Sequence, residues 1–290
     1  MKKHEVIIIG AGPAGMAAAI QLKRFGITPL VFEQKRVGGL LWNANLVENY
    51  PGFPGGISGA ELVAGMIAQL KGHQLGVTEE KVYSVDFQAN QFVIESQKGD
   101  YISQALIIAS GTKPNQFPEN FIPKKVADRV RYEVADLAGV AGEQILIVGA
   151  GDAAFDYAIN LAKENDVVIL NRGSEIKALP LLQERVSANP KIRYLENSRI
   201  NCLRQDDGGL VVELEVPEGG FELHCGYLLG AIGRSAALPS LSDALHKEMK
   251  GLQKEGLLQI IGDVKNGIFR QTSIAVGDGV MAAMKIYGNI

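Results

Sequence analysis

The sequence is poor in cysteine, and this scarcity excludes several classes of protein. Cys202 and Cys225 are the only two among 290 residues, and their spacing fits neither a C-x-x-C redox pair nor a zinc knuckle. Two thiols are also too few for the disulfide framework of a small secreted protein. Both lie in strand-like patterns, so we interpret them as buried, inert thiols. The composition fits a reducing compartment, and we expect a cytoplasmic protein.

The sequence also lacks an excess of charge of one sign and a long uninterrupted apolar run. Lys and Arg number 29 against 32 Asp and Glu, and the net charge of −3 gives no general attraction to nucleic acid or to an anionic membrane. The apolar stretch from Val6 to Ile20 contains three glycines and a proline, and no other run approaches the ~20 apolar residues of a membrane span. The four histidines have no metal-ligand spacing. We therefore expect no nucleic-acid partner, no membrane and no metal.

The chain is instead rich in apolar residues, at 47%, and in glycine, with 34 residues. An apolar content this high excludes a disordered protein. At 290 residues a single core stops growing, so we expect two domains.

The first part of the chain has the pattern strand, glycine turn, helix, strand and acid. An apolar run leads into Gly10-Ala11-Gly12-Pro13-Ala14-Gly15, a helical pattern follows to Phe25, and a second apolar run ends at Glu33. In this dinucleotide-binding fingerprint the first glycine permits a tight turn, the second lets the backbone approach a pyrophosphate, and the third lets helix and strand pack closely. The helix N-terminus offers N–H groups to the phosphates, and the acid is placed to accept ribose hydroxyls. The predicted contacts are Gly10, Gly12, Pro13, Ala14, Gly15, Glu33 and Gln34.

The same pattern recurs in the second half of the chain. An apolar run ending at Val148 leads into Gly149-Ala150-Gly151-Asp152-Ala153-Ala154, a helical pattern follows to Leu161, and the strand Val167 to Leu170 ends at Asn171-Arg172. Ala154 replaces the third glycine, which the fingerprint tolerates because a methyl group still permits close packing. Two fingerprints predict two nucleotides. The contacts predicted for the second are Gly149, Gly151, Asp152, Ala153, Ala154, Asn171, Arg172 and Lys177.

The repetition extends beyond the fingerprints. Alternating runs after the first unit, at 82–87, 92–96 and 101–108, predict a three-stranded antiparallel meander, and runs at 192–195, 200–203, 209–216 and 220–229 suggest another. We predict an α/β protein with two Rossmann-like, three-layer ββα dinucleotide-binding domains, the second inserted into the first. The predicted boundaries are 1–113 with 238–290 for the first domain and 114–237 for the second.

Further segments give the sequence a family resemblance. They are Gly38-Gly39-Leu40, the stretch 47–59 with Asn49-Tyr50-Pro51-Gly52, and Gly262-Asp263 followed by Arg270-Gln271 and a helical pattern at 274–287. With the fingerprints, they make the chain resemble the two-dinucleotide-binding-domain flavoproteins, in particular the low-molecular-weight thioredoxin reductases and the thioredoxin-reductase-like ferredoxin–NAD(P)+ reductases. The resemblance implies FAD in the first domain and a nicotinamide nucleotide in the second. The additional cofactor-binding residues that it implies are Gly39, Leu40, Asn49, Gly111, Ile232, Gly233, Arg234, Gly262, Asp263, Arg270 and Gln271.

The sequence departs from thioredoxin reductases at their redox-active C-x-x-C-D motif. The two cysteine positions hold Tyr132 and Ala135, although the aspartate remains as Asp136. Without these thiols there is no dithiol relay, so reduction of thioredoxin by the family's mechanism is excluded. The surrounding residues resemble the ferredoxin-reductase branch. As candidate catalytic residues we take Tyr132, to cover the flavin face, and Asp136, to donate a proton.

The end of the second strand of each fingerprint gives an expectation about the nicotinamide nucleotide. The first domain has Glu33 there, whereas the second has Asn171-Arg172. A carboxylate repels a ribose 2′-phosphate, while a neutral Asn beside an Arg removes the repulsion and adds a phosphate donor. We expect NADPH, with NADH as the alternative.

We therefore expect a homodimeric enzyme in which NAD(P)H reduces FAD and the flavin reduces an external acceptor. Ferredoxin or flavodoxin ranks first, and a small quinone- or disulfide-type molecule second. A cluster of basic residues could attract an acidic ferredoxin, although a solvated surface is the commoner explanation. Two alternatives remain: a non-catalytic nucleotide or flavin sensor or interaction protein, and a flavoprotein that receives its electrons from ferredoxin and reduces a small quinone- or disulfide-type molecule. The basic residues are Lys113, Lys124, Lys125, Arg129 and Arg131.

Overall fold

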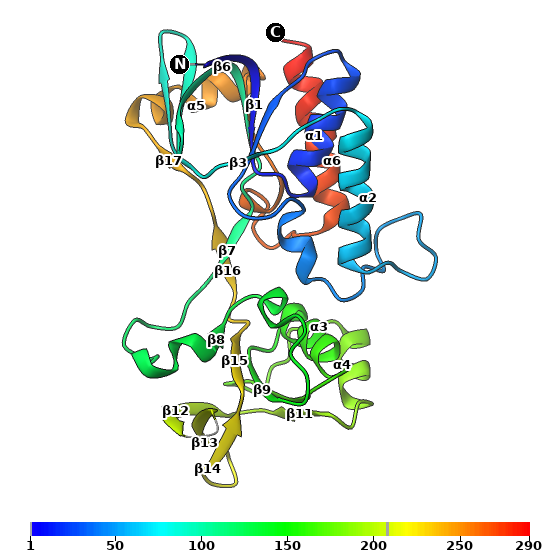
Figure 1. The fold of residues 1–290 in the computed structure, drawn as a ribbon, viewed down its shortest axis with the longest axis vertical. Coiled ribbons are helices and arrows are strands. Elements are labelled where there is room, and N and C mark those ends of the chain that lie inside the picture. The colour runs from blue at the N-terminus through cyan, green and yellow to red at the C-terminus, as the bar shows by residue number, and fades with distance from the viewer. Residues whose placement is uncertain (1, 207–208) are drawn as a thin grey trace. The chain divides into compact units, whose positions relative to one another are not determined.

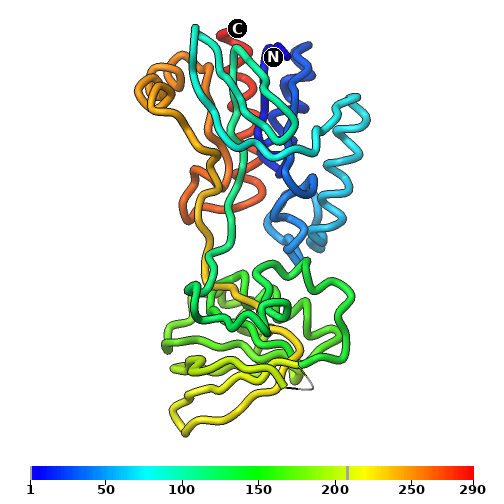
Figure 2. The backbone as a smooth tube through the Cα atoms, turned by 60° about the vertical axis from the view of Figure 1, so that its left-hand side comes forward, coloured from blue at the N-terminus to red at the C-terminus, as the bar shows by residue number. Residues whose placement is uncertain are grey.

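The computed structural model describes residues 2–206 and 209–290, which form two compact units. Unit 1 comprises residues 1–42, 47–113 and 235–290, and unit 2 comprises residues 43–46 and 114–234 (Figure 1). The short segment Asn43–Leu46 thus belongs with unit 2, whereas the sequence boundaries placed it in the first domain. After residue 113 the chain passes through unit 2, and it returns to unit 1 at residue 235. Figure 2 shows this path as the colour changes from cyan through green and yellow to red.

Unit 1 is built on a sheet of eight strands with helices on both faces. Its strands run in the order β17-β4-β5-β6-β1-β2-β3, and β18 also pairs with β6. The strands are β1 (Lys2–Ile9), β2 (Leu30–Glu33), β3 (Thr78–Glu79), β4 (Val82–Gln88), β5 (Gln91–Ser96), β6 (Gly99–Ile108), β17 (Ser240–Leu241) and β18 (Leu258–Ile260). The helices are α1 (Pro13–Arg24), α2 (Gly59–Gly72), α5 (Asp243–Lys254) and α6 (Thr272–Tyr287), with 3-10 turns η1 (Gly39–Asn43) and η4 (Gly262–Val264).

Strand β6 belongs both to the antiparallel part of this sheet and to its parallel part. Its first half, from Gly99 to Ser103, pairs antiparallel with β5, and its last three residues pair parallel with β18. Between Tyr101 and Ile108 it also pairs parallel with β1. The predicted meander of β4, β5 and β6 is therefore confirmed, and its third strand continues into the parallel sheet.

The pleat of the central strands separates two hydrophobic cores. Ile8 and Ile107 face α1 and α6, while Ile7 and Leu106 face the meander and α5. All four side chains are fully buried. Side chains of a strand alternate between faces, so apolar runs without polar interruption are what a sheet covered on both faces requires.

Unit 2 repeats the plan with a parallel sheet of five strands, in the order β11-β10-β9-β15-β8, and a separate antiparallel sheet, β12-β13-β14. Its strands are β8 (Val130–Arg131), β9 (Gln144–Val148), β10 (Asp166–Leu170), β11 (Ile192–Leu195), β12 (Arg199–Asp206), β13 (Gly209–Glu215), β14 (Phe221–Cys225) and β15 (Tyr227–Gly230). Its helices are α3 (Asp152–Leu161) and α4 (Pro180–Ser187), with 3-10 turns η2 (Lys124–Arg129) and η3 (Val134–Leu137).

Two details of the second meander were predicted wrongly. The run 192–195 forms β11, which pairs parallel with β10 and not with the meander. The run 220–229 is two strands, because Gly226 separates β14 from β15 and its N–H donates to the carbonyl of Gln144 at 2.8 Å. This bond draws the chain out of the meander and onto the parallel sheet.

The two connecting segments pair with each other. Strand β7 (Thr112–Pro114) and strand β16 (Arg234–Ala236) form a two-stranded sheet. Within the described ranges, no helix has the combined length and apolar character that crossing a membrane requires. The same residues contain no group of three or more His, Cys, Asp or Glu that could hold a metal ion.

Candidate functional site

The first glycine turn is packed too tightly for side chains at two of its three glycines. Gly10 has a φ of +105°, and a Cβ there would lie 2.3 Å from the carbonyl oxygen of Ala109. A Cβ on Gly15 would lie 1.9 Å from the oxygen of Gly10, so helix α1 contacts the turn directly. At Gly12, by contrast, φ is −74° and a Cβ would meet no described atom within 4 Å. Space therefore remains at the glycine that the fingerprint assigns to the pyrophosphate.

The acid at the end of β2 is tied to this turn. Glu33 accepts the N–H of Ala11 through Oε2 at 2.9 Å and that of Lys35 through Oε1 at 3.0 Å. The loop after β2 closes over the same place, because the N–H of Gly38 donates to the oxygen of Ala11 at 2.8 Å. A Cβ on Gly39 would lie 3.4 Å from the Cα of Gly12, so these two predicted residues are neighbours.

Gly111, Gly262 and Asp263, which were also predicted in unit 1, follow strands that end at one edge of the sheet. Strands β1, β2, β6 and β18 run parallel, and residues at or next to their carboxyl ends are in register: Ile9 with Phe32 and Ile108, and Ile108 with Ile260. Gly111 follows β6, and Gly262-Asp263 follows β18. The carboxyl edge of a parallel sheet is where open α/β folds bind ligands.

The predicted loop and the predicted closing motif, far apart in sequence, meet in the structure. The amide of Asn49 donates to Oε1 of Gln271 at 2.7 Å, and the hydroxyl of Ser273 donates to the carbonyl of Asn49 at 3.3 Å. Gln271 is the N-cap position of α6, and Arg270 is half-buried just before it. Ser273 is not among the predicted residues, and its only sequence signal is its place in the first turn of the last helix.

These residues of unit 1 fit a dinucleotide. The start of α1, with Pro13 at its first position, presents backbone N–H groups that a helix cannot satisfy internally. Gly12 leaves room for a phosphate, and Glu33 retains lone pairs for ribose hydroxyls beyond its two backbone bonds. Gln34 is exposed beside it, and Leu40 lies in η1 next to Gly39.

The second glycine turn repeats this geometry in unit 2. Gly149 has a φ of +141°, and a Cβ there would lie 2.3 Å from the carbonyl oxygen of Ala231. At Gly151 a Cβ would again contact none of the described atoms within 4 Å. Ala154 is fully buried at the α3 side of the turn, whereas Asp152 and Ala153 are exposed. The duplicated sequence motif thus gives a duplicated turn with the same open position.

The loop after β10 closes over the second turn, as the loop after β2 closes over the first. The N–H of Lys177 donates to the oxygen of Ala150 at 2.9 Å, and Oδ1 of Asp152 accepts the N–H of Leu179 at 2.8 Å. The amide of Asn171 donates to the oxygen of Glu175 at 3.0 Å and to the Tyr194 hydroxyl at 2.9 Å. Its side chain therefore shapes the loop.

The predicted residues Ile232, Gly233 and Arg234 follow the carboxyl end of strand β15 in the parallel sheet of unit 2. Gly233 has a φ of +100°, and its oxygen accepts the N–H of Asn115 at 2.9 Å. Ile232 is half-buried against the core on the meander side. Arg234 lies with its guanidinium 3.0 Å from Oε1 of Glu133, and both side chains are at least four-fifths buried, at 15% and 19% exposure.

Glu133 belongs to a polar cluster of unit 2 whose residues were not predicted from the sequence. The amide of Asn43 donates to its Oε2 at 2.5 Å, and Oδ1 of Asn43 accepts the N–H of Ala135 at 3.0 Å. Beside them, the N–H of Asn45 donates to Oδ2 of Asp156 at 2.9 Å. Burial raises the pKa of the Asp156 carboxyl, against the opposing effects of the Asn45 N–H and Lys163. No sequence motif marks these residues, because Asn43 and its partner Glu133 lie 90 positions apart in the chain.

Tyr132 and Asp136, the candidate catalytic residues, have different surroundings within unit 2. The Tyr132 hydroxyl accepts the N–H of Phe117 at 3.1 Å, and its ring lies 5.8 Å from that of Phe117. A Cβ on Gly230 would come within 2.8 Å of the same ring. Tyr132 therefore fills volume in the core on the meander side, whereas Asp136 is exposed in η3. Their catalytic roles stay predictions.

The two cysteines differ, and one was predicted wrongly. Cys225 is buried as expected, and burial raises the pKa of its thiol to about 12. Cys202 is exposed, because β12 has an irregularity between Ile200 and Cys202 and buries Leu203 in its place. Across β13, Cys202 lies opposite Glu213 and Cys225 opposite Leu210, and the structure of the described chain has both as free thiols.

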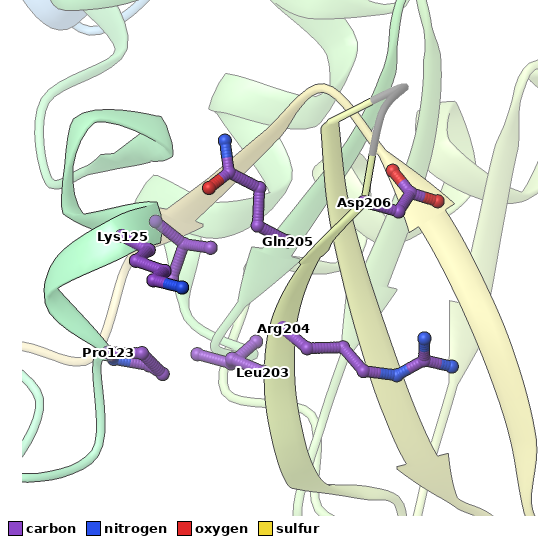
Figure 3. Close-up of a pocket in the computed structure, with 7 residues that line it drawn as sticks. Pro123, Lys125, Leu203, Arg204, Gln205 and Asp206 are labelled. Atoms are coloured by element: carbon purple, nitrogen blue, oxygen red, sulfur yellow. The ribbon is translucent and has the colours of Figure 1, made fainter.

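The predicted basic residues gather partly around one aromatic ring. The guanidinium carbons of Arg129 and Arg131 lie 5.5 and 5.8 Å from the centre of the Tyr227 ring. A nearby open hollow of about 650 Å³ lies between η2 and β12 and is lined by Lys125, Arg204 and Asp206 (Figure 3). Arg204 pairs with Glu222, and Asp206 lies 3.0 Å from His224. The hollow contains none of the predicted cofactor-binding residues.

Comparison with known proteins agrees with this geometry. A family model described as pyridine nucleotide-disulphide oxidoreductase matches residues 4–279. The thioredoxin reductase of Mycolicibacterium smegmatis is 30% identical over 299 residues, covering 97% of this chain and 94% of that protein. The thioredoxin reductase of Bacillus subtilis is 29% identical over 312 residues, covering 98% and 94%. The chain spans 64% of the bifunctional thioredoxin reductase/thioredoxin of Mycobacterium leprae, with 29% identity.

Two solved structures have the same fold. The thioredoxin reductase of Lactococcus lactis gives a TM-score of 0.83 at 26% identity and covers 98% of each chain. The bacillithiol disulfide reductase of Staphylococcus aureus gives a TM-score of 0.75 at 22% identity and covers 99% of each chain. The predicted fold of two Rossmann-like dinucleotide-binding domains is therefore confirmed.

Proposed function

This chain belongs to the pyridine nucleotide-disulphide oxidoreductase family, and from that premise we propose that it is an FAD enzyme that oxidises NAD(P)H without a thiol relay. It is a thioredoxin-reductase-like oxidoreductase, and members of this family typically bind FAD and NAD(P)H.

We assign FAD to unit 1. Gly12 and the start of α1 would hold the pyrophosphate, Glu33 the ribose hydroxyls, and Asp263 the phosphate-ribitol region. Helix α6 would direct its N-terminus, with its partial positive charge, toward the flavin, where it stabilises negative charge on the ring. When bound, the flavin supplies a site that accepts a hydride and releases electrons. The protein contributes binding, orientation and electrostatics, because hydride transfer needs no side-chain acid.

The observation that carries the proposal is the identity of residues 132 and 135. Where thioredoxin reductases have two cysteines, this chain has Tyr132 and Ala135, and the Tyr132 ring fills part of the core. Neither remaining thiol offers a substitute. Cys225 is buried with a pKa raised to about 12, and Cys202 lies on strand β12, far in sequence from positions 132 and 135. Electrons must therefore leave the flavin without passing through a protein disulfide.

We assign NADPH to unit 2. Position 171 is a neutral Asn, so no carboxylate repels a 2′-phosphate there. Its side-chain amide donates to the oxygen of Glu175 and to the hydroxyl of Tyr194. Arg172 and Lys177 are exposed on that loop, where they can reach a phosphate. Glu175 is also exposed between them and weakens the attraction.

For the acceptor we rank ferredoxin or flavodoxin first. The support is the basic surface of Lys124, Lys125, Arg129 and Arg131, which suits an acidic protein partner. A small quinone- or disulfide-type molecule ranks second.

We also propose a homodimer. Seven of the thirteen large apolar side chains that are exposed in the described chain lie among its last 23 residues. Three of them, Ile274, Met281 and Met284, share one side of α6. Contiguous exposed apolar surface of this kind is typical of protein interfaces.

The proposal is tested by following the visible absorbance of the purified protein under anaerobic conditions. NADPH and NADH are added separately, and the reduced protein is then mixed with ferredoxin, flavodoxin, a soluble quinone or oxidised thioredoxin. We expect rapid bleaching with NADPH, reoxidation by ferredoxin or flavodoxin, and none by thioredoxin. A colourless protein that takes up no FAD, or bleaching that only thioredoxin reverses, would refute the proposal. Bound FAD that neither nucleotide reduces would point to a sensor instead.

A further inference from the structure

Helices α1 and α6 pack closely at the fingerprint end of unit 1. A Cβ on Gly279 would lie 2.2 Å from the carbonyl oxygen of Ala14 and 3.0 Å from the N atom of Ala18. The first two turns of α6 therefore lie directly against the helix start that follows the glycine turn. Residues next to Gly279 on α6 are placed to act on whatever surrounds that turn.

The short turn from Gly262 to Asn266 lies in the same region. Gly262 has a φ of +71°, and a Cβ there would lie 2.9 Å from the Cβ of Ala14. The oxygen of Gly262 accepts the N–H groups of Lys265 at 2.9 Å and of Asn266 at 3.2 Å. A glycine in this conformation loses more backbone freedom on folding than any other residue, so a turn built on it needs outside support to keep one shape.

That support comes from a side chain of α6. Oδ2 of Asp278 accepts the backbone N–H of Gly262 at 3.0 Å and the side-chain amide of Asn266 at 2.7 Å. One carboxylate oxygen thus holds both the first and the last residue of the turn. Hydrogen bonds to an ionised acceptor are shorter and roughly twice as strong as those between neutral groups.

We propose that Asp278 is a positioning residue for FAD, which fixes the Gly262–Asn266 turn so that Asp263 is presented in its binding orientation. This inference rests on the proposed function, in which unit 1 binds FAD through Asp263. Asp278 acts through the turn and not by contact with the cofactor. Because the turn is ordered before the cofactor arrives, its ordering cost does not reduce the binding affinity.

The test compares FAD affinity and thermal unfolding in three proteins: wild type, Asp278→Ala and the control Lys285→Ala. Lys285 is exposed on the same helix, away from the turn. After the cofactor is removed, FAD is titrated back and its fluorescence quenching gives the dissociation constant. We expect Asp278→Ala to bind FAD about tenfold more weakly or worse, because a bond to a charged acceptor contributes roughly this much. The control is expected to bind like the wild type.

The melting temperatures of the apoproteins and holoproteins separate positioning from general stabilisation. Positioning predicts that Asp278→Ala narrows the gap between holoprotein and apoprotein. An unchanged dissociation constant, or an equal fall of both melting temperatures with the gap preserved, would overturn the inference. If the wild type itself takes up no FAD, the proposed function fails first, and this separate result distinguishes the two.

A pair of reciprocal substitutions covers the case in which Asp278→Ala does not fold. Asn266→Asp places two carboxylates against each other and is expected to weaken FAD binding. The double variant Asn266→Asp with Asp278→Asn restores a donor and an acceptor, and the oxygen of the new amide on α6 remains available to the N–H of Gly262. Recovery of most of the wild-type affinity supports positioning, and a double variant as weak as the single one contradicts it.

Discussion

The carboxylate of Glu33 accepts the N–H of Ala11 at 2.9 Å, so the acid at the end of β2 also holds the middle of the glycine turn. In the second unit the corresponding Asn171 turns to its own loop and to Tyr194. The two fingerprints therefore share their backbone geometry and differ in charge at the place where a ribose would bind. This difference is the basis for assigning different nucleotides to the two units.

Gly12 and Gly15 are expected to respond differently to the same substitution. Gly12→Ala puts a methyl group into space that the described residues leave open, so the apoprotein should lose no more than about 0.5 kcal/mol of stability. FAD affinity should nevertheless fall about tenfold or more, because the methyl group occupies the pyrophosphate position. Gly15→Ala should destabilise the apoprotein by about 2 kcal/mol or more, since its Cβ would collide with backbone. Denaturant unfolding and FAD titration measure both, and equal FAD affinity in wild type and Gly12→Ala would contradict the site.

Arg172→Ala is expected to change the choice of coenzyme. Loss of one charged donor to a 2′-phosphate should raise the KM for NADPH about tenfold, while the KM for NADH should stay within about twofold of wild type. Stopped-flow reduction with each coenzyme gives both values, and Ser187→Ala, in the same unit, serves as the control. A parallel increase for the two coenzymes would show that Arg172 does not bind the phosphate.

Removal of both cysteines is expected to leave catalysis unchanged. With Cys202→Ser and Cys225→Ser combined, electron transfer from NADPH to the acceptor should stay within about twofold of wild type, as no thiol takes part. Because Cys225 is buried and the pKa of its thiol is raised to about 12, an alkylating reagent should modify it only after unfolding, which mass spectrometry can follow. A tenfold loss of turnover in the folded double variant would require a thiol step after all.

Asp156 is expected to make stability depend on pH. Burial raises the pKa of this carboxyl above its ordinary value of 3.8. At a pH between the ordinary pKa and the raised pKa, the folded protein therefore keeps a proton that the unfolded chain has released. The free energy of unfolding therefore falls as the pH rises through this window and is level above it. Asp156→Asn removes the titration and keeps an oxygen for the N–H of Asn45.

Thermal unfolding between about pH 4 and pH 7 tests this expectation. The melting temperature of Asp156→Asn should exceed that of wild type at neutral pH, and the difference should shrink toward the acid end. Asp166→Asn, at an exposed aspartate of the same unit, is the control and should show no such trend. A difference that grows as the pH falls would contradict the assignment.

Charges on the exposed face of α6 are expected to separate the proposed dimer. Met281 and Met284 are 49% and 57% exposed, so their replacement by Glu should leave the fold of the chain intact. Two like charges per chain facing their copies should convert a dimer to monomers. Light scattering coupled to size-exclusion chromatography measures the mass. A monomeric wild type, or a variant that remains dimeric, would remove this face as the interface.

Local sequence patterns predicted the parts of this fold that depend on local physics. The strand, glycine turn and helix of each fingerprint follow from steric rules at Gly10 and Gly149, where only glycine adopts the required φ. The pleat period predicted the first meander. It predicted the second one poorly, because β11 and β15 are apolar strands whose partners are chosen by the parallel sheet and not by their own patterns.

The sequence by itself determined that the chain has two dinucleotide-binding turns and no cysteine pair, since both are properties of residues adjacent in the chain. Only the tertiary structure decided that Asp278 supports the turn at Gly262, that Asn49 meets Gln271, and that Asn43 reaches Glu133. Each of these contacts joins residues far apart in sequence, and such contacts depend on how sheets and helices pack. No local propensity encodes that packing.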